Sequence, residues 1–468
     1  YYNLQDNINT STLTGYQIYA VRDFDGSYAI TVDNGADITF DIIGYTVNLG
    51  EDVTIDGKLT VLDSAETKGL LTSSKTIQNN GELVIRDMTL SAMTTNTLLQ
   101  NNNSLTLQNA TITSDKGTTL YLPNQEVTLS LDNNSRIIAE SDQPALINDS
   151  PSTTINAGTI SGKTCTVKNN SGKTFTLNAG TITGKTSVVC NYGGTFTMNN
   201  GLVSAEHDGE IKAIYTPWDY SGSELNINGG KVSVRYTGTL SYAHIAGIYT
   251  ETSNDTVNVS GGEIEVAYDS TRYGTVSGIF SSSTLNITGG HIKVTSRSTS
   301  NTFGVNSGRD GHLTIDGADV IIEAHNTESS AATDGARQEY SEAHLKKGTI
   351  ISTSKNGSTL GFHNDRSTVY VEDGMSISSH SETQNAYGIW HDDWNYPGTI
   401  NMTGGNISAT TDASDKLGIG LISRYVTVTG GTVYGSTYGI NGAIDNNNTT
   451  ITLGVNEPPL YNGVDEDG

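Results

Sequence analysis

Two short segments of the chain hold the side chains best suited to ligand chemistry. Residues 214–222 read Ile-Tyr-Thr-Pro-Trp-Asp-Tyr-Ser-Gly, and residues 388–398 read Gly-Ile-Trp-His-Asp-Asp-Trp-Asn-Tyr-Pro-Gly. Together they contain all 3 tryptophans of the chain. Flat aromatic faces beside carboxylates and amides suit sugar rings, which offer apolar C–H patches and polar rims. The residues that we expect to bind a ligand are Tyr215, Trp218, Tyr220, Trp390, Trp394 and Tyr396. The alternative is that these rings only cover a wide part of the fold against water.

The best catalytic candidates are Asp392 and Asp393, which follow His391. Two carboxylates can act as general acid and general base on a glycosidic bond. Adjacent residues of a strand point to opposite faces, so this pair converges only if it lies in a loop. The sequence therefore favours binding over catalysis and leaves the question of an enzyme open.

Metal-binding patterns are weak. No pair among the 9 histidines has the spacing of a zinc site. Asp310, Asp316 and Asp319 offer the carboxylate oxygens that Ca²⁺ prefers, although Asp-rich turns are commonly just solvated. We expect no cofactor, with Ca²⁺ as the alternative.

A repeated phrase positions these residues. It reads apolar–polar–apolar–polar–Gly–x–apolar, as in Leu177–Ile182 and Leu285–Ile292. The residue before its last two positions recurs at 158, 180, 201, 230, 262, 290, 318, 348, 375, 405 and 431. A constant phrase at an uneven period indicates a stacked repeat whose loops vary in length. A sharp corner commonly needs positive φ, which glycine adopts freely.

The alternation of apolar residues within the phrase has the two-residue period of a strand. A third short strand precedes each phrase, as in Gly247-Ile248-Tyr249 and Gly278-Ile279-Phe280. Three short strands per repeat predict an all-β fold, a single-stranded right-handed parallel β-helix of roughly 15 turns. One polar position of the phrase should form a hydrogen-bonded ladder; its members are Asn156, Asn178, Asn199, Asn228, Ser260, Thr288, Asp316, Thr403 and Thr429.

The repeat also relates the two tryptophan segments. Ile214 lies 16 residues before position 230 (230 − 214), and Ile389 lies 16 residues before position 405 (405 − 389). We therefore expect both segments at the same corner of the coil, about 29 Å apart if six turns separate them at the strand spacing.

No linker or composition break divides the chain. We predict one β-helical domain over residues 1–457, with less regular turns in 1–150 and regular Gly-Gly turns in 151–457, followed by a tail over 458–468. The chain opens at Tyr1 without methionine, so we expect a processed or excised piece of a longer protein.

Charge and cysteine content restrict the partners and the compartment. The net charge is −25, from 50 acidic and 25 basic residues, which excludes nucleic acid and an anionic membrane surface as expected partners. Counted back from Phe175 and Phe196, Cys165 and Cys190 differ by four positions, or roughly 13 Å along a strand. A disulfide needs a much shorter separation, so we predict two unpaired, inward-facing thiols.

The segment 38–47, Ile-Thr-Phe-Asp-Ile-Ile-Gly-Tyr-Thr-Val, resembles the Leu-Asn-Gly-His-Thr-Ile opening of large secreted β-helix proteins. These are adhesin-like surface proteins of anaerobic, often gut-dwelling, bacteria. Asn-Ile-Thr-Gly-Gly-x-Ile at 286–292 is similar to their repeat, whereas Ile43 and Tyr45 replace the usual Asn and His. The resemblance implies a right-handed parallel β-helix of the pectate-lyase-like superfold, located on or outside the cell. That superfold hosts lyases, hydrolases and pure binding proteins.

The sequence is compatible with three functions. The leading one is an extracellular or bacterial cell-surface, adhesin-like protein that recognises carbohydrate or a host glycoprotein, without inserting directly into a membrane. The second is a polysaccharide lyase or glycoside hydrolase that uses Asp392 and Asp393. The third is a passive stalk. The sequence specifies neither the ligand nor the oligomeric state.

Overall fold

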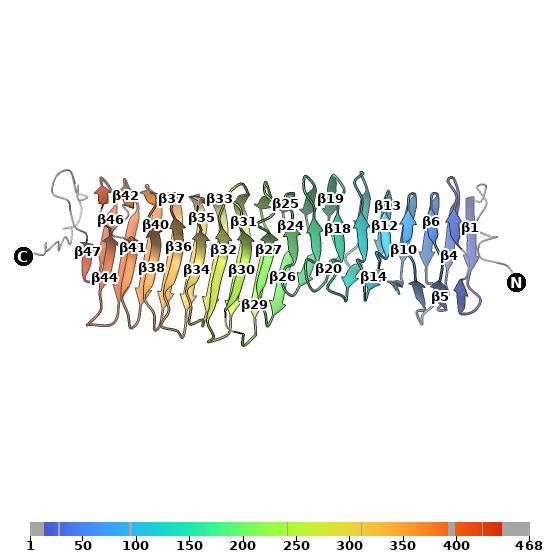
Figure 1. Cartoon of the computed structure of the whole chain (residues 1–468), viewed down its shortest axis with the longest axis horizontal. Coiled ribbons are helices and arrows are strands. Elements are labelled where there is room, and N and C mark those ends of the chain that lie inside the picture. Colours follow the sequence, from blue (N-terminus) through green and yellow to red (C-terminus); the bar gives the residue numbers. More distant parts are fainter. Residues whose placement is uncertain are drawn as a thin grey trace, which may run out of the picture. The chain divides into compact units, whose positions relative to one another are not determined.

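The computed structural model describes residues 14–26, 29–92, 96–240, 242–309, 311–391, 398–423 and 425–441. Every regular element within these ranges is a β-strand, and no helix occurs there. Three strands follow one another in each turn, and strands pair in parallel with their equivalents in the next turn, with a break in the ladder of first strands after β16 (Figure 1). The predicted fold is confirmed: the chain is a parallel β-helix of the right-handed type, with about 16 turns.

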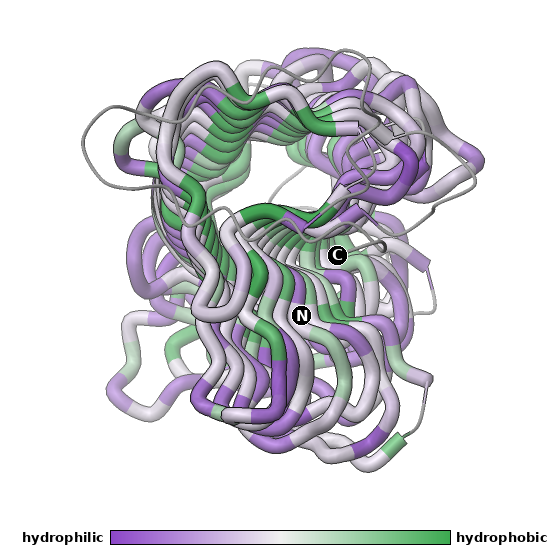
Figure 2. The backbone as a smooth tube through the Cα atoms, turned by 90° about the vertical axis from the view of Figure 1, so that its left-hand side faces the viewer, coloured by the Kyte–Doolittle hydropathy of each residue, from purple (hydrophilic) through white to green (hydrophobic). Residues whose placement is uncertain are grey.

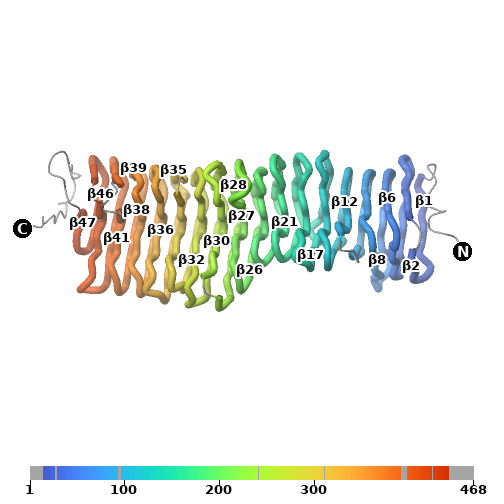
Figure 3. The backbone as a smooth tube through the Cα atoms, viewed as in Figure 1, coloured from blue at the N-terminus to red at the C-terminus, as the bar shows by residue number. Residues whose placement is uncertain are grey.

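The chain divides into two compact units, Tyr1–Ser204 and Ala205–Gly468. The strand β26 (Leu202–His207) contains the division. Within each unit the turns succeed one another in sequence order (Figure 3). Both units use the same three-strand turn, although the sequence predicted one domain with a change of regularity near residue 150.

In unit 1 (1–204) each turn contributes a first, a second and a third strand. The first strands are β1 (Thr14–Tyr19), β4 (Asp37–Asp41), β7 (Lys58–Leu62), β10 (Glu82–Arg86), β13 (Ser104–Gln108), β16 (Thr128–Leu131), β19 (Ser152–Ile155), β22 (Thr174–Leu177) and β25 (Thr195–Met198). The second strands are β2 (Phe24–Gly26), β5 (Thr46–Leu49), β8 (Leu70–Ser73), β11 (Thr89–Ala92), β14 (Thr111–Ser114), β17 (Arg136–Ala139), β20 (Thr159–Ser161) and β23 (Thr181–Gly184). The third strands are β3 (Ile30–Val32), β6 (Val53–Ile55), β9 (Ile77–Asn79), β12 (Leu99–Asn101), β15 (Leu120–Leu122), β18 (Leu146–Asn148), β21 (Val167–Asn169) and β24 (Val189–Asn191).

In unit 2 (205–468) the first two strands of several turns merge into one long strand that continues round the corner. The first and second strands are β28 (Glu224–Ile227), β29 (Lys231–Tyr236), β31 (Thr256–Tyr268), β33 (Thr284–Ser296), β35 (His312–Asn326), β37 (Glu342–Ser354), β39 (Thr368–Val371), β40 (Met375–Ser381), β42 (Thr399–Met402), β43 (Asn406–Thr411), β45 (Tyr425–Val428) and β46 (Thr432–Gly435). The third strands, which we call sheet C of unit 2, are β27 (Ile211–Thr216), β30 (Ala243–Thr250), β32 (Gly274–Ser281), β34 (Thr302–Ser307), β36 (Thr333–Glu339), β38 (Thr359–Asp365), β41 (Ala386–His391), β44 (Gly418–Ile422) and β47 (Tyr438–Asn441).

Inward side chains stack on their equivalents in the next turn. Phe175 and Phe196 are register partners on β22 and β25, both are fully buried, and their rings stack with centroids 6.2 Å apart. Hydrophobic stretches lie above one another in columns within each unit (Figure 2). A buried Val, Leu, Ile or Phe contributes roughly 1.5–3 kcal/mol, so a few inward positions per turn, repeated in register, are enough for a stable core.

The predicted glycine corners are confirmed at most repeat positions. Gly262 has φ 81° and Gly290 has φ 96°. A Cβ at Gly262 would also lie 2.8 Å from the carbonyl oxygen of Gly230 in the preceding turn. Glycine is required there both by the left-handed backbone and by the close approach of the next turn.

Two polar ladders connect the turns of unit 1. The exposed ladder predicted from the repeat is present in its first part, where the amide of Asn178 donates to Asn156 and that of Asn199 donates to Asn178, both at 2.8 Å. Further along, Thr403 and Thr429 donate to backbone carbonyls instead. A second ladder, fully buried, was not predicted: the amide of Asn148 donates to Asn169 over 2.8 Å, as Asn169 does to Asn191 over 2.7 Å. Buried amides are tolerated because each finds a partner.

The prediction of two free thiols is wrong, because Cys165 and Cys190 form a disulfide with Cα atoms 5.3 Å apart. The turn after β21 is one residue longer than the turn after β24, so counting from the phenylalanines overstated the offset. Cys165 also lies before β21, at a corner where its φ is 44°. The extended rise per residue does not apply at a corner. Cys190 is the register partner of Lys168 on an outward column, although its side chain is fully buried.

Candidate functional site

Ile214 and Ile389, at the starts of the two tryptophan segments, lie on one register column of sheet C, as the sequence predicted. The column runs from Ile214 through Ile248, Ile279, Val305, Ala336 and Phe362 to Ile389, which is six turns. These residues are fully buried. The next residue of each strand therefore points outward, and the outward column is Tyr215, Tyr249, Phe280, Asn306, Arg337, His363 and Trp390.

The loop after β27 carries an exposed tryptophan. Trp218 is 74% exposed and Tyr220 is 38% exposed, whereas Pro217 between them and the strand is buried. A backbone hydrogen bond from Tyr220 to the Pro217 carbonyl, 3.1 Å long, closes the loop on itself. The two predicted aromatic residues therefore lie together in a compact turn.

Two acidic residues of the following turn hold this loop in place. Asp255 is 1% exposed; its carboxylate accepts hydrogen bonds from the Thr216 hydroxyl at 2.7 Å and from the Ser223 N–H at 2.8 Å. Asp255 thus joins both ends of the loop. The Glu251 carboxylate accepts from the Tyr215 hydroxyl at 3.0 Å and from the Trp218 N–H at 3.2 Å. The exposed indole is therefore positioned by charge-assisted hydrogen bonds, which are stronger than neutral ones.

Behind the loop, aromatic rings stack along the outward column. Tyr249 stacks on Phe280 with centroids 4.5 Å apart, and the Lys212 ammonium lies 4.2 Å from the centroid of Tyr249. Lys212 also pairs with Glu210 at 3.3 Å and with Glu251 at 3.7 Å. Burial, together with the negative charge of Glu251 and Glu210, raises the pKa of Tyr249 to about 12. The phenol therefore stays protonated at physiological pH and can donate a hydrogen bond.

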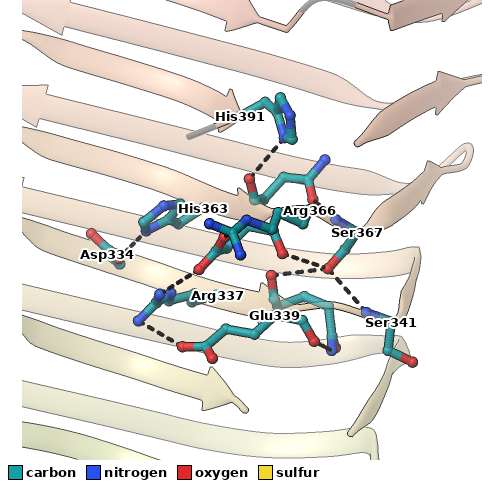
Figure 4. A network of polar contacts seen from close by, with 11 residues as sticks. Asp334, Arg337, Glu339, Ser341, His363, Arg366, Ser367 and His391 are labelled. Atoms are coloured by element: carbon teal, nitrogen blue, oxygen red, sulfur yellow. Dashed lines mark hydrogen bonds and ion pairs between the residues drawn. The ribbon is translucent and has the colours of Figure 1, made fainter. Parts of the chain in front are cut away.

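A second polar group lies further along the same face, on β36 and β38. Arg337 pairs with Glu339 at 2.9 Å and with Asp365 at 2.7 Å, and its guanidinium lies 5.9 Å from the ring centroid of Phe303. Figure 4 shows Arg337 directed at Glu339, with Arg366 and Ser367 from the following turn nearby. Glu339 and Asp365 are register partners on adjacent strands, so two carboxylates share one guanidinium.

His363 forms the link from this group to Trp390. Its Nδ1 lies 2.9 Å from an oxygen of Asp334 (Figure 4). Its ring stacks on Trp390 with centroids 5.4 Å apart. Tyr387 packs against Trp390 as well, at 5.3 Å. Asp334 is 1% exposed, and its other oxygen is buried without a hydrogen-bond partner among the described residues. Such an atom costs about 1–3 kcal/mol, so this part of the face is not optimised for stability alone.

The structure places His391 away from that face. It is 2% exposed, its Nδ1 lies 3.1 Å from the Asn364 carbonyl oxygen, and its Nε2 accepts from the Gly398 N–H at 3.3 Å. Both ring nitrogens are therefore used in positioning the chain. The other predicted residues of this segment, Asp392, Asp393, Trp394 and Tyr396, lie outside the described residues.

No group of three potential metal ligands converges within the ranges that the structure describes. Asp316 instead pairs with Lys346 at 3.4 Å, and Asp310 lies outside those ranges. Sequence reasoning missed Asp255, Glu251 and Arg337. Asp255 and Glu251 act on a loop one turn earlier, 30 to 40 positions back in the chain. The described part of the chain contains no helix long and apolar enough to span a membrane.

No protein-family model, curated protein or solved structure matches this chain.

Proposed function

We propose that this chain is an adhesin-like binding protein that recognises carbohydrate, free or on a host glycoprotein, through the outer face of sheet C in unit 2. Trp218 and Tyr220 would make the first contacts, with Trp390, on the register column of Tyr215, as a further contact. The observation that carries the proposal is that Trp218 is 74% exposed on a loop tied at both ends by the buried Asp255.

A held loop that keeps an indole in water is unusual on energetic grounds. Leaving a large apolar side chain exposed forfeits roughly 1.5–3 kcal/mol of burial. Aromatic side chains that are held rigidly lose little entropy on binding and serve as anchors. The polar atoms beside Trp218, from Glu251, Tyr215 and Lys212, supply hydrogen-bond partners for hydroxyl groups. An aromatic face with a few fixed polar groups is the usual composition of a sugar site.

The disulfide supports a location outside the cytoplasm. Disulfides persist in oxidising compartments and are rare where thiols are kept reduced. The bond between Cys165 and Cys190 joins adjacent turns of unit 1. An extracellular or cell-surface location is therefore part of the proposal.

The test is a glycan array followed by titration calorimetry on the glycans that bind. Trp218→Ala should weaken binding about tenfold or more, as expected for an interface anchor. The matched control is Tyr434→Ala, because Tyr434 is 43% exposed on β46, outside sheet C. Circular dichroism checks that each variant keeps its strands. An array without a bound glycan, or equal affinity of the Trp218 and Tyr434 variants, would refute the proposal.

Polysaccharide cleavage is a second candidate function, and one observation favours it. Glu339 and Asp365 are in register on adjacent strands and bind the same guanidinium of Arg337, so one side chain bridges their two carboxylates. Paired carboxylates are what glycoside hydrolysis requires. Incubation with polysaccharides that the array identifies should then release reducing ends, and Glu339→Gln should abolish that release.

A further inference from the structure

A second pair of exposed aromatic residues borders the same strands at their opposite end. Tyr242 is 77% exposed and lies directly before β30, while Tyr273 is 49% exposed and lies directly before β32. Their rings are 5.1 Å apart between centroids and tilted by 49°. Trp218 lies just after β27, the strand that pairs with β30. Exposed rings therefore occur at both ends of these paired strands.

Buried tyrosines hold the loops that carry this second pair. The Tyr236 hydroxyl donates to the Leu240 carbonyl at 3.1 Å, and the Tyr268 hydroxyl donates to the Arg272 carbonyl at 3.2 Å. The two buried rings stack with centroids 4.6 Å apart and planes within 8°. The loops are thus tethered at equivalent points, four residues after each buried tyrosine.

The backbone at Tyr242 is strained. Its φ is 69°, in the left-handed region that a side chain with a Cβ seldom adopts. Its N–H donates to the Tyr273 carbonyl at 2.6 Å, which joins the two loops in this conformation. Strain of this kind costs about 1–3 kcal/mol and concentrates at functional sites. Here it keeps a large ring exposed, which gives no stability in return.

Between the two aromatic ends, the outward face of β30 and β32 carries both buried and exposed positions. Ala246 and Ser277 are register partners near the middle of the strands and are each 2% exposed, whereas His244, which pairs with Thr275, is exposed. Toward the Trp218 end, Tyr249 and Phe280 are register partners and their rings stack. An extended ligand that lies across these strands therefore passes over His244 and the stacked rings of Tyr249 and Phe280 between its two aromatic ends.

We propose that Tyr242 and Tyr273 form the far end of one continuous site, and that its ligand is an unbranched, neutral oligosaccharide lying along β30. This inference rests on the proposed function and adds its ligand class and a second contact point. β30 has 8 residues, and a strand of that length spans about 26 Å at 3.3 Å per residue. Several sugar rings are needed to reach from Tyr242 to Trp218, so a disaccharide contacts only one end.

The charges on this face select against acidic polymers. Lys212 is paired with both Glu210 and Glu251, so the three groups leave one net negative charge beside the strands. The whole chain carries a formal charge of −25. A field of one sign repels ligands of the same sign and lowers their association rate. Polyuronates and sulfated glycans are therefore disfavoured.

The experiment is titration calorimetry with cello-, manno- and chito-oligosaccharides of two to eight sugars, and with oligogalacturonates of the same lengths. Affinity for one neutral series should rise at least tenfold from the dimer to the longest members, with one ligand bound per chain. Tyr242→Ala and Trp218→Ala should each remove that gain with length. Tyr242→Gly, which removes the ring and relieves the positive φ, should behave like Tyr242→Ala and guards against loss of folding. Tyr434→Ala should keep the full gain.

Several results would overturn the inference while leaving the proposed function intact. One is that both Tyr242 variants still show the whole increase of affinity with oligosaccharide length. Another is a stoichiometry of two that Tyr242→Ala reduces to one, because that would mean two independent sites. Tighter binding of oligogalacturonates, or no binding of any neutral series by a protein that still binds other array glycans, would also overturn it. The proposed function itself fails only if Trp218→Ala leaves all glycan binding unchanged or the array shows no bound glycan.

Discussion

Removing the Asp255 carboxylate should release the Trp218 loop without unfolding the turns around it. In Asp255→Ala the Thr216 hydroxyl and the Ser223 N–H lose the carboxylate that accepts from them at 2.7 and 2.8 Å, in a region where both residues are buried. Hydrogen bonds to a charged group contribute about 1.5–3 kcal/mol each. The two are not independent, so a combined loss of about 3 kcal/mol is expected.

The loss should be local because the loop can open to water. Hydrogen exchange followed by mass spectrometry should show faster exchange across residues 216–223, by up to about a hundredfold for 3 kcal/mol, with little change in the strands. Asp255→Asn keeps one acceptor oxygen, so its exchange rate across residues 216–223 should lie between those of the wild type and Asp255→Ala. Asp269→Ala is the matched control, because the Asp269 side chain is 55% exposed in a surface ion pair with Arg235.

The reasoning also links this anchor to ligand binding. If Asp255 positions Trp218, Asp255→Ala should weaken glycan binding although Asp255 itself is buried and cannot touch a ligand. Unchanged exchange across residues 216–223 in Asp255→Ala would refute the anchoring argument. Faster exchange with unchanged glycan affinity would show that Asp255 fixes the loop without affecting binding, and would refute the idea that a fixed Trp218 loop is needed for glycan recognition.

Three further predictions concern stability and titration. Reduction of the disulfide between Cys165 and Cys190, 25 positions apart, should lower the urea midpoint of unfolding, since a loop of that length corresponds to about 3 kcal/mol; a midpoint insensitive to reductant would contradict this. Gly278→Ala should destabilise unit 2, because a Cβ there would clash with Cγ2 of Ile292; an unchanged midpoint of thermal unfolding would show that β32 and β33 can move apart to accommodate the methyl group. The Tyr249 pKa of about 12 exceeds the unfolded value near 10, so the stabilisation is present below pH 10 and is lost as the pH rises toward 12. Ultraviolet titration should show one phenol transition near pH 12 that Tyr249→Phe removes.

The sequence predicted the features that repeat. A glycine with a forced φ, such as Gly262, and a column of inward residues, such as Ile214 to Ile389, recur once per turn, so each turn confirms the others. Because the strands pair in register, counting back from a motif glycine located both tryptophan segments at the same position of the turn. The physical cause is that the register of the paired strands is fixed, because a shift by one residue would turn inward side chains outward and outward side chains inward.

The features that occur once could not be predicted by counting. Cys165 lies at a corner with φ 44°, where the chain does not advance by the extended rise per residue. A single-residue difference in turn length then brings it within 5.3 Å of Cys190. Asp255 is similar: its carboxylate reaches back to Thr216 across loops whose lengths no repeat determines. The lengths and conformations of corners and loops do not follow the repeat, because only the strands are fixed by backbone pairing between turns.

The two roles considered for the aromatic residues, covering the fold and contacting a ligand, apply to different rings. Tyr249 is stacked on Phe280 at 4.5 Å on one side and contacts Tyr215 at 6.1 Å on the other, so the register places it between neighbours. A ring in that position covers the strands. Trp218 lies beyond the end of its strand and has no equivalent ring in the next turn, where Thr252 has the corresponding position after β30. Its face stays open because the ladder does not reach it. Side chains that leave the register are therefore the ones available for recognition, and in sheet C of unit 2 these lie at the two ends of β27, β30 and β32.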